Sequence, residues 1–249
     1  MRSIAITFLA ATLILAATYY FGLLRFNYPS PTKFPVQGID VSHHQGQIDW
    51  YQASLNGVQF AYIKATEGSD FKDPSFTYNW MQCQYSDIPH GAYHFFSFCR
   101  PGAEQARNFL AMVPYDAHAL PPALDLEFSD NCGKTPSRAA MIKEVSAFVA
   151  AIAPRFPQLP VFYVTPEFYK RYLEGHEAEY PAHRLWIRNI IHEPSQKPCD
   201  EWSFWQYASR GRIPGIRGPV DLNTFCGNGD LFASMIKSTG TIRSDRINN

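Results

Sequence analysis

Short apolar segments and longer amphipathic segments alternate along most of the chain. Runs of apolar, β-branched or aromatic residues predict strands at 38–41, 60–65, 91–96, 123–128 and 161–164. The amphipathic stretches between them predict helices at 74–85, 102–112 and 137–153. Alternating strands and helices are typical of a mainly parallel sheet, and for a chain of this length a barrel of the TIM type is the leading fold.

The pattern changes after residue 184. Apolar runs at 185–191, 202–207 and 220–225 leave no room for helices between them, so we expect the closing strands to be antiparallel. The globular barrel is predicted to occupy residues 37–236. Residues 237–249 are polar and are expected to form a loose tail.

Residues 1–25 have the character of a membrane segment. No charge interrupts the run 4–24, and roughly 20 apolar residues are what a bilayer crossing requires. The run is longer than the apolar part of a usual signal peptide, and 16–19 make a poor cleavage site, so an uncleaved anchor is favoured over a cleaved signal. Either alternative exports the rest of the chain. Three prolines in 26–36 predict an extended tether between anchor and barrel.

Composition narrows the range of partners. The chain has 22 basic and 22 acidic residues, so no overall field attracts nucleic acid or holds the folded part on a membrane. Aromatic residues make up 15% of the sequence, which suits a neutral ring-shaped ligand such as a sugar and equally suits a well-filled core. Nothing in the sequence points to a cofactor or to an oligomer, and we expect a monomer.

The chain has five cysteines without a CxxC pattern, which favours disulfides over zinc in an exported protein. Cys99 and Cys132 each follow a strand-like run and are predicted to pair in neighbouring loops. Cys199 and Cys226 flank one hairpin-like region and form a second candidate pair. Cys83 is then expected to be free in a helix.

Four acidic residues lie at the borders of predicted strands, where barrels of this type carry their active groups: Asp40, Asp125, Glu127 and Asp221. Side chains alternate along a strand, so Asp125 and Glu127 point to one side with their backbones about 6 to 7 Å apart. Two carboxyls in a confined space favour protonation of one of them. Glycoside hydrolysis needs this division, with one acid and one anion. An Asp-x-Glu that faces solvent or forms ion pairs is the structural alternative.

His43 and His44 raise the possibility of a metal site. Adjacent residues on extended backbone point apart, and no third ligand has convincing spacing. We therefore predict no metal.

Taken together, the motifs form an ordered set. They are the segments 38–46, 48–50, 62–68, 91–95, 122–127, 205–207 and 220–223, which read GIDVSHHQG, IDW, YIKATEG, GAYHF, PALDLE, WQY and VDLN. This order, spread over 37–225, resembles the muramidases of glycoside hydrolase family 25. The resemblance implies an eight-stranded, modified TIM-type barrel with fewer helices than strands. It also implies a substrate, the β-1,4 bond between N-acetylmuramic acid and N-acetylglucosamine in the peptidoglycan strand.

The resemblance also implies roles for individual residues. Glu127 corresponds to the general acid, and Asp125 to the residue that orients the substrate's acetamido group as it attacks the anomeric carbon with net retention. Further positions are implied to line the groove: the acids Asp40 and Asp221, the aromatic residues Tyr93 and Trp205, and, on weaker grounds, Lys64, Glu67, His94 and Tyr163.

One late strand departs from the family pattern. Where the family often has Trp-x-Ala-x-Tyr, this chain has Trp-Ile-Arg-Asn-Ile at 186–190, which replaces an aromatic sugar contact. Arg188 is a candidate partner for a substrate carboxylate, or else an exposed charge. Two other functions stay open at this point: an inactive barrel that only binds cell wall, and a hydrolase of another N-acetylated glycan such as chitin.

Overall fold

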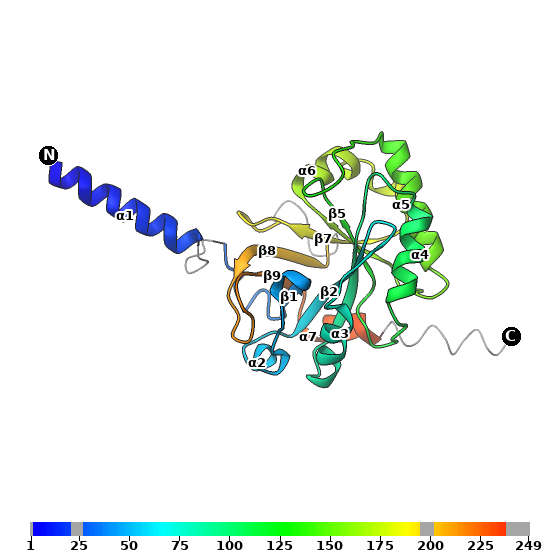
Figure 1. Cartoon of the computed structure of the whole chain (residues 1–249), viewed down its shortest axis with the longest axis horizontal. Coiled ribbons are helices and arrows are strands. Elements are labelled where there is room, and N and C mark those ends of the chain that lie inside the picture. Colours follow the sequence, from blue (N-terminus) through cyan, green and yellow to red (C-terminus); the bar gives the residue numbers. More distant parts are fainter. Residues whose placement is uncertain (1, 21–26, 195–201, 238–249) are drawn as a thin grey trace.

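The computed structural model describes residues 2–20, 27–194 and 202–237. In this part of the chain, eight strands close into a barrel because β1 pairs with both β9 and β2 (Figure 1). A short strand β3 (Phe71–Lys72) adds a hairpin to β2 outside the ring. The barrel strands, in ring order, are β1 (Gln37–Val41), β2 (Phe60–Glu67), β4 (His90–Phe95), β5 (Ala123–Leu126), β6 (Val161–Val164), β7 (Arg184–Arg188), β8 (Phe204–Gly211) and β9 (Val220–Phe225).

The predicted barrel is confirmed, but its antiparallel part is smaller than expected. β7 runs parallel to β6, and β8 runs parallel to β7. Among the eight strands of the ring, only β9 is antiparallel to its neighbours, β8 and β1. The segment between β7 and β8 therefore returns the chain to the end of the barrel at which the parallel strands begin, and its described residues contain no crossover helix. Short spacing between apolar runs is thus compatible with parallel strands.

The outer helices lie between the strands in the chain and cover part of the barrel (Figure 1). The helices α3 (Phe76–Tyr85), α4 (Gly102–Met112) and α5 (Arg138–Ile152) agree with the predicted segments to within two residues. The shorter elements were not predicted. These are η1 (His43–Gln45), α2 (Trp50–Leu55), α6 (Pro166–Phe168), the π-helical turn η2 (Tyr169–Leu173), η3 (Glu177–Glu179) and α7 (Gly229–Lys237). The apolar residues of α7, Phe232, Met235 and Ile236, nevertheless recur at helical spacing.

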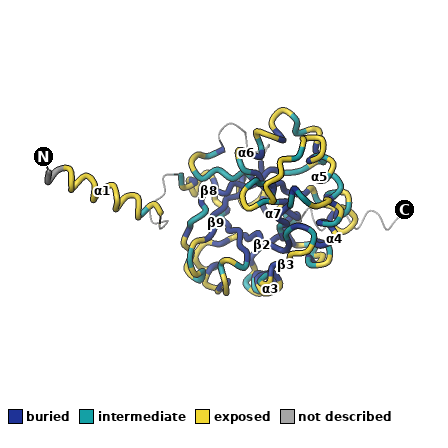
Figure 2. The backbone as a smooth tube through the Cα atoms, turned by 45° about the horizontal axis from the view of Figure 1, so that its top comes forward, coloured by how far each residue is buried: buried dark blue, intermediate teal, exposed yellow. Residues whose placement is uncertain are grey.

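The core has two parts. The larger cluster contains outward-facing strand residues and the apolar faces of the helices, and a smaller cluster contains aromatic rings such as Phe60, Tyr62, Trp186 and Phe204. Figure 2 shows the strands as the buried centre of the molecule and the outer helix faces as exposed. Gly91 makes room for this packing, because a Cβ there would lie 2.7 Å from the Tyr62 ring. The rings fill the barrel below the site, so the polar residues lie at its mouth.

The proline-containing segment does not form a free tether. Phe34 is 1% exposed, and its ring lies 6.0 Å from that of Trp202 and 5.9 Å from that of Trp205. The side-chain amide of Asn27 donates to the carbonyl of Tyr207 at 2.7 Å. Pro29, Phe34 and Val36 are buried, so these residues hold the segment 27–36 against the barrel while residues 30–33 are exposed.

The N-terminal helix α1 (Arg2–Tyr20) projects from the barrel (Figure 1). Within the described ranges, no helix is long and apolar enough to cross a membrane, and the predicted anchor is not supported. The predicted apolar run continues to residue 24, and residues 21–24 lie outside the described residues.

The cysteine predictions are confirmed where the structure describes them. Cys99 and Cys132 form a disulfide, and Cys83 is free and buried. Cys226 is also disulfide-bonded. Cys199, the other half of the second predicted pair, lies outside the described residues, as does the predicted tail after Lys237.

Candidate active site

A cavity of about 320 Å³ lies at the mouth of the barrel. Asp125 and Glu127 reach it from the carboxyl end of β5, and Asp40 reaches it from the end of β1. Asp221 comes from the beginning of β9, which lies at the same end because this strand is antiparallel. The strand directions thus gather all four predicted acids in one cavity.

Asp125 and Glu127 lie on the same side of β5, as their spacing predicts, and both line the cavity. Burial raises the pKa of Glu127 to about 7, a rise that the positive charge of Arg188 opposes. Burial and the neighbouring Glu127 raise the pKa of Asp125 well above its usual range. One oxygen of Asp125, Oδ1, is buried and has no hydrogen-bond partner among the described residues. The pair therefore combines the Glu127 carboxyl, which is partly protonated at neutral pH, with a buried Asp125 oxygen that can accept a hydrogen bond from a ligand.

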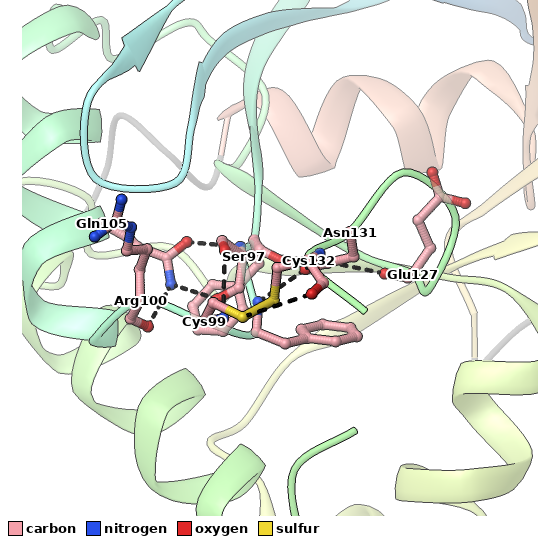
Figure 3. Close-up of a disulfide and its surroundings, with 9 residues drawn as sticks. Ser97, Cys99, Arg100, Gln105, Glu127, Asn131 and Cys132 are labelled. Atoms are coloured by element: carbon pink, nitrogen blue, oxygen red, sulfur yellow. Dashed lines mark hydrogen bonds between the residues drawn. A yellow bond between two sulfur atoms is a disulfide. The ribbon is translucent and has the colours of Figure 1, made fainter. Parts of the chain in front are cut away.

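The backbone of Glu127 is held by the loop that follows it. The Asn131 amide donates to the carbonyls of Phe96, at 2.9 Å, and Glu127, at 3.0 Å. The Asn131 side-chain oxygen accepts from the amide N–H of Phe98 at 3.0 Å. Asn131 precedes Cys132, so the disulfide to Cys99 joins the loops after β4 and β5 beside these bonds. Figure 3 shows the Glu127 carboxyl pointing away from the disulfide.

Asp40 and Asp221 form a second acidic pair. They oppose each other in the register of β1 and β9. Oδ2 of Asp40 accepts hydrogen bonds from Asn223 at 2.7 Å and Gln206 at 2.9 Å. Burial raises the pKa of both carboxyls, most strongly that of Asp221, and a hydrogen bond between them lowers the pKa of Asp40 while raising that of Asp221. Asp221 is therefore the protonated partner, and Asp40 accepts from it.

Four of the six other residues implied to line the groove also reach the cavity: Lys64, Glu67, Tyr93 and Tyr163. Lys64 and Glu67 form an ion pair at 2.7 Å. The Tyr163 hydroxyl donates to the Gln206 side-chain oxygen at 3.1 Å. Burial raises the pKa of Tyr93 and of Tyr163, so both phenols stay protonated. The Tyr93 hydroxyl can donate to a ligand, whereas the Tyr163 proton is already donated to Gln206.

The structure does not bring the other two, His94 and Trp205, to the cavity. His94 is fully buried between Thr66, at 2.7 Å, and Gln105, at 3.1 Å, and burial lowers its pKa to about 3. Trp205 is 1% exposed, and its indole N–H donates to the Asn189 carbonyl at 2.8 Å on the outer side of β8. Both residues support the fold around the site.

Three further residues help to form the site, although the sequence did not indicate them as site residues. Trp186 and Gln206 line the cavity, and Asn223 holds Asp40. Trp186 and Gln206 occupy inward positions of β7 and β8. A polar residue inside an otherwise apolar strand, such as Gln206, is the signal that points to them.

The two adjacent histidines have an arrangement that differs from the prediction. They lie in η1, where Ser42 caps the turn, and their rings are 4.0 Å apart. Nδ1 of His43 lies 2.8 Å from the carboxylate of Asp73. Among the described residues, no group of three or more His, Cys, Asp or Glu is arranged to hold a metal.

Comparisons with known proteins agree with this geometry. The profile of glycosyl hydrolases family 25 matches residues 39–216. Lysozyme M1 of Streptomyces globisporus is 35% identical over 219 residues, which cover 82% of this chain and 72% of that protein. Protein YegX of Escherichia coli is 36% identical over 202 residues, 79% of this chain and 72% of that protein. The structure of a family 25 glycosyl hydrolase from Bacillus anthracis superposes with a TM-score of 0.76 at 35% identity, covering 85% of this chain and 98% of that one. The chain is thus a glycoside hydrolase and belongs to glycosyl hydrolases family 25.

Proposed function

We propose that this protein is an exported muramidase that hydrolyses peptidoglycan at the β-1,4 bond between N-acetylmuramic acid and N-acetylglucosamine. The observation that carries the proposal is the pair of Asp125 and Glu127 in the cavity, with the pKa of Glu127 near 7. A site that only bound glycan would gain nothing from four acids whose burial raises their pKa values, so the inactive alternative is disfavoured.

Glu127 acts as the general acid. At neutral pH a large fraction of its carboxyl is protonated, and it transfers the proton to the glycosidic oxygen as the bond to the anomeric carbon breaks. After the leaving sugar departs, the Glu127 carboxylate accepts a proton from the water that attacks the anomeric carbon. The same group therefore serves in both steps.

Asp125 acts on the acetamido group of the substrate. Its unpartnered Oδ1 is suited to accept the acetamido N–H, which turns the acetamido carbonyl oxygen toward the anomeric carbon. Attack by that oxygen gives a cyclic oxazolinium ion. The positive charge of this ion favours the ionised form of Asp125, against the burial that raises its pKa, and the carboxylate then stabilises the ion. Hydrolysis of this ion from the opposite face yields net retention.

Product analysis tests the proposal. Purified protein is incubated with peptidoglycan and, separately, with chitin oligomers. Mass analysis of the released fragments is expected to show reducing N-acetylmuramic acid ends, and NMR of the first product is expected to show the β-anomer. Reducing N-acetylglucosamine ends from peptidoglycan, or preferential cleavage of chitin, would refute the assigned bond. Binding without release would instead favour the inactive barrel.

Export is tested by the location of the protein. Fractionation followed by N-terminal sequencing of the mature chain is expected to recover it outside the cytoplasm. Recovery of the intact chain in the cytoplasm alone would refute this part of the proposal.

A further inference from the structure

A second cavity, of about 800 Å³, lies beside the barrel mouth. Its wall contains the segment 44–51, residues 78 and 82 of α3 and the loop 215–217. His44 and Gln45 line both this cavity and the catalytic one. The two cavities are therefore adjacent. An extended ligand that passes from the catalytic cavity over His44 and Gln45 enters the second cavity directly.

The side chains that line this second cavity suit a carbohydrate. Tyr51 is 64% exposed and Tyr78 is 37% exposed, and their rings offer an apolar face to a sugar. The Tyr78 hydroxyl donates to the Ile48 carbonyl at 3.1 Å, which fixes this ring in the wall. The side-chain amides of Gln47 and Gln82 make no hydrogen bond with the rest of the described chain, and each amide can both donate and accept. Sugar hydroxyls need this combination of rings and two-way hydrogen-bonding groups.

The charge of the wall differs from that of the catalytic cavity. Among the described residues that line it, Asp49 and Arg217 carry opposite charges. Asp49 is already committed to the fold, because its carboxylate accepts from the Gln52 N–H at 3.0 Å and caps α2. Arg217 is thus left as a cation that can meet a lactyl carboxylate of a peptide-free glycan strand, while the rest of the wall suits sugar hydroxyls.

The wall is preformed. The Asp49 N–H donates to the Gly215 carbonyl at 2.9 Å, and the Gln45 side chain donates to the Pro219 carbonyl at 3.3 Å. Gly215 has φ +94, and a Cβ there would lie 2.6 Å from the Asp49 carbonyl oxygen. These contacts join two loops that are distant in sequence, so a ligand does not have to order them when it binds.

We infer that the second cavity binds further sugars of the glycan strand whose cleavage takes place in the first, and thereby gives the enzyme a preference for long strands. This inference rests on the proposed function and deepens it. Tyr51 supplies a stacking surface, and Gln47 and Gln82 supply hydrogen bonds.

The experiment compares wild type with Tyr51→Ala and Gln82→Ala on two substrates: long peptide-free glycan strands of peptidoglycan and a tetrasaccharide from the same source. The measured quantity is the ratio of kcat/KM for the long substrate to that for the short one. One lost stacking contact is expected to lower this ratio about three- to ten-fold. Tyr85→Ala is the matched control. Tyr85 lies on α3, as Gln82 does, is 74% exposed and lines neither cavity.

The outcomes separate this inference from the proposed function. An unchanged ratio in both variants, or the same fall in Tyr85→Ala, overturns the inference while wild-type cleavage upholds the muramidase. If wild type cuts neither substrate, the proposed function fails. The inference is then tested by the binding of long glycan strands to the Glu127→Gln variant and to the double variant Glu127→Gln, Tyr51→Ala. Weaker binding to the double variant supports the inference, and equal binding overturns it.

Discussion

Replacement of Glu127 by glutamine should stabilise the folded protein above neutral pH while it removes most turnover. The pKa of Glu127 is about 7 in the folded state against a usual 4.5. A raised pKa in the folded state means that this carboxyl's contribution to stability is complete below pH 4.5 and is lost as the pH rises through 7. Each pKa unit corresponds to about 1.36 kcal/mol, so the loss is about 3 kcal/mol.

Urea unfolding with the disulfides intact measures this effect at pH 4 and pH 8. At pH 4 the two proteins should have the same free energy of unfolding to within about 0.5 kcal/mol. At pH 8 the glutamine variant should be more stable by about 2 to 3 kcal/mol, because its amide cannot ionise in the buried site. Its kcat should fall by about 10²- to 10⁴-fold, since the amide cannot deliver a proton.

Glu174→Gln is the control, because Glu174 is exposed and lies outside the cavity. Its stability relative to wild type should not change between the two pH values. If the difference between wild type and Glu127→Gln is also independent of pH, burial does not raise the pKa of Glu127. Retention of wild-type turnover in this variant would exclude Glu127 as the acid.

Four other predictions use different measurements. Above pH 7, kcat/KM should fall about ten-fold per pH unit as Glu127 ionises, and a flat profile to pH 9 would contradict its role. Asp125→Asn should lower kcat by about 10²- to 10³-fold with an unchanged circular dichroism spectrum, whereas a change in KM alone would argue against acetamido assistance. Serine at both Cys99 and Cys132 should lower the free energy of unfolding by about 2 to 4 kcal/mol, and an unchanged thermal midpoint would mean that the disulfide adds nothing to stability. Trp205→Phe should cost about 1 kcal/mol of stability through the lost indole hydrogen bond and leave KM within about two-fold. A large rise in KM would indicate that Trp205 contacts the substrate after all.

The parts of the fold that could be predicted are those with a continuous apolar signal. Residues 161–164 are apolar throughout and form β6 with the predicted bounds. The Asp-x-Glu spacing also predicted correctly that Asp125 and Glu127 share a side, because strand geometry fixes the direction of alternate side chains. Direction in the sheet has no such signal, and so β7 and β8 proved parallel where antiparallel strands were expected.

The side on which a residue lies is harder to predict in a barrel, because both faces of its strands are buried. Trp205 and Gln206 are 1% and 3% exposed, so exposure to solvent does not separate the inner face from the outer one. The polar Gln206 faces Asp40 inside, and the aromatic Trp205 faces Phe34 outside. For His43 and His44, the Ser42 cap converts an apparently extended segment into a turn, which brings together two rings that were expected to point apart.

The pairing of β1 with β9 has a consequence for biosynthesis. β1 begins at Gln37 and β9 ends at Phe225. β1 is therefore the first barrel strand to leave the ribosome, and its second edge stays uncovered until β9, the last one, has been synthesised. Asp40 and Asp221 face each other across this seam. A nascent chain that lacks β9 thus lacks Asp221, one of the four acids, and leaves the edges of β1 and β8 open, which favours aggregation. Hydrolytic competence therefore arises only when synthesis of the barrel is complete, and enzyme activity reports on closure of the whole ring.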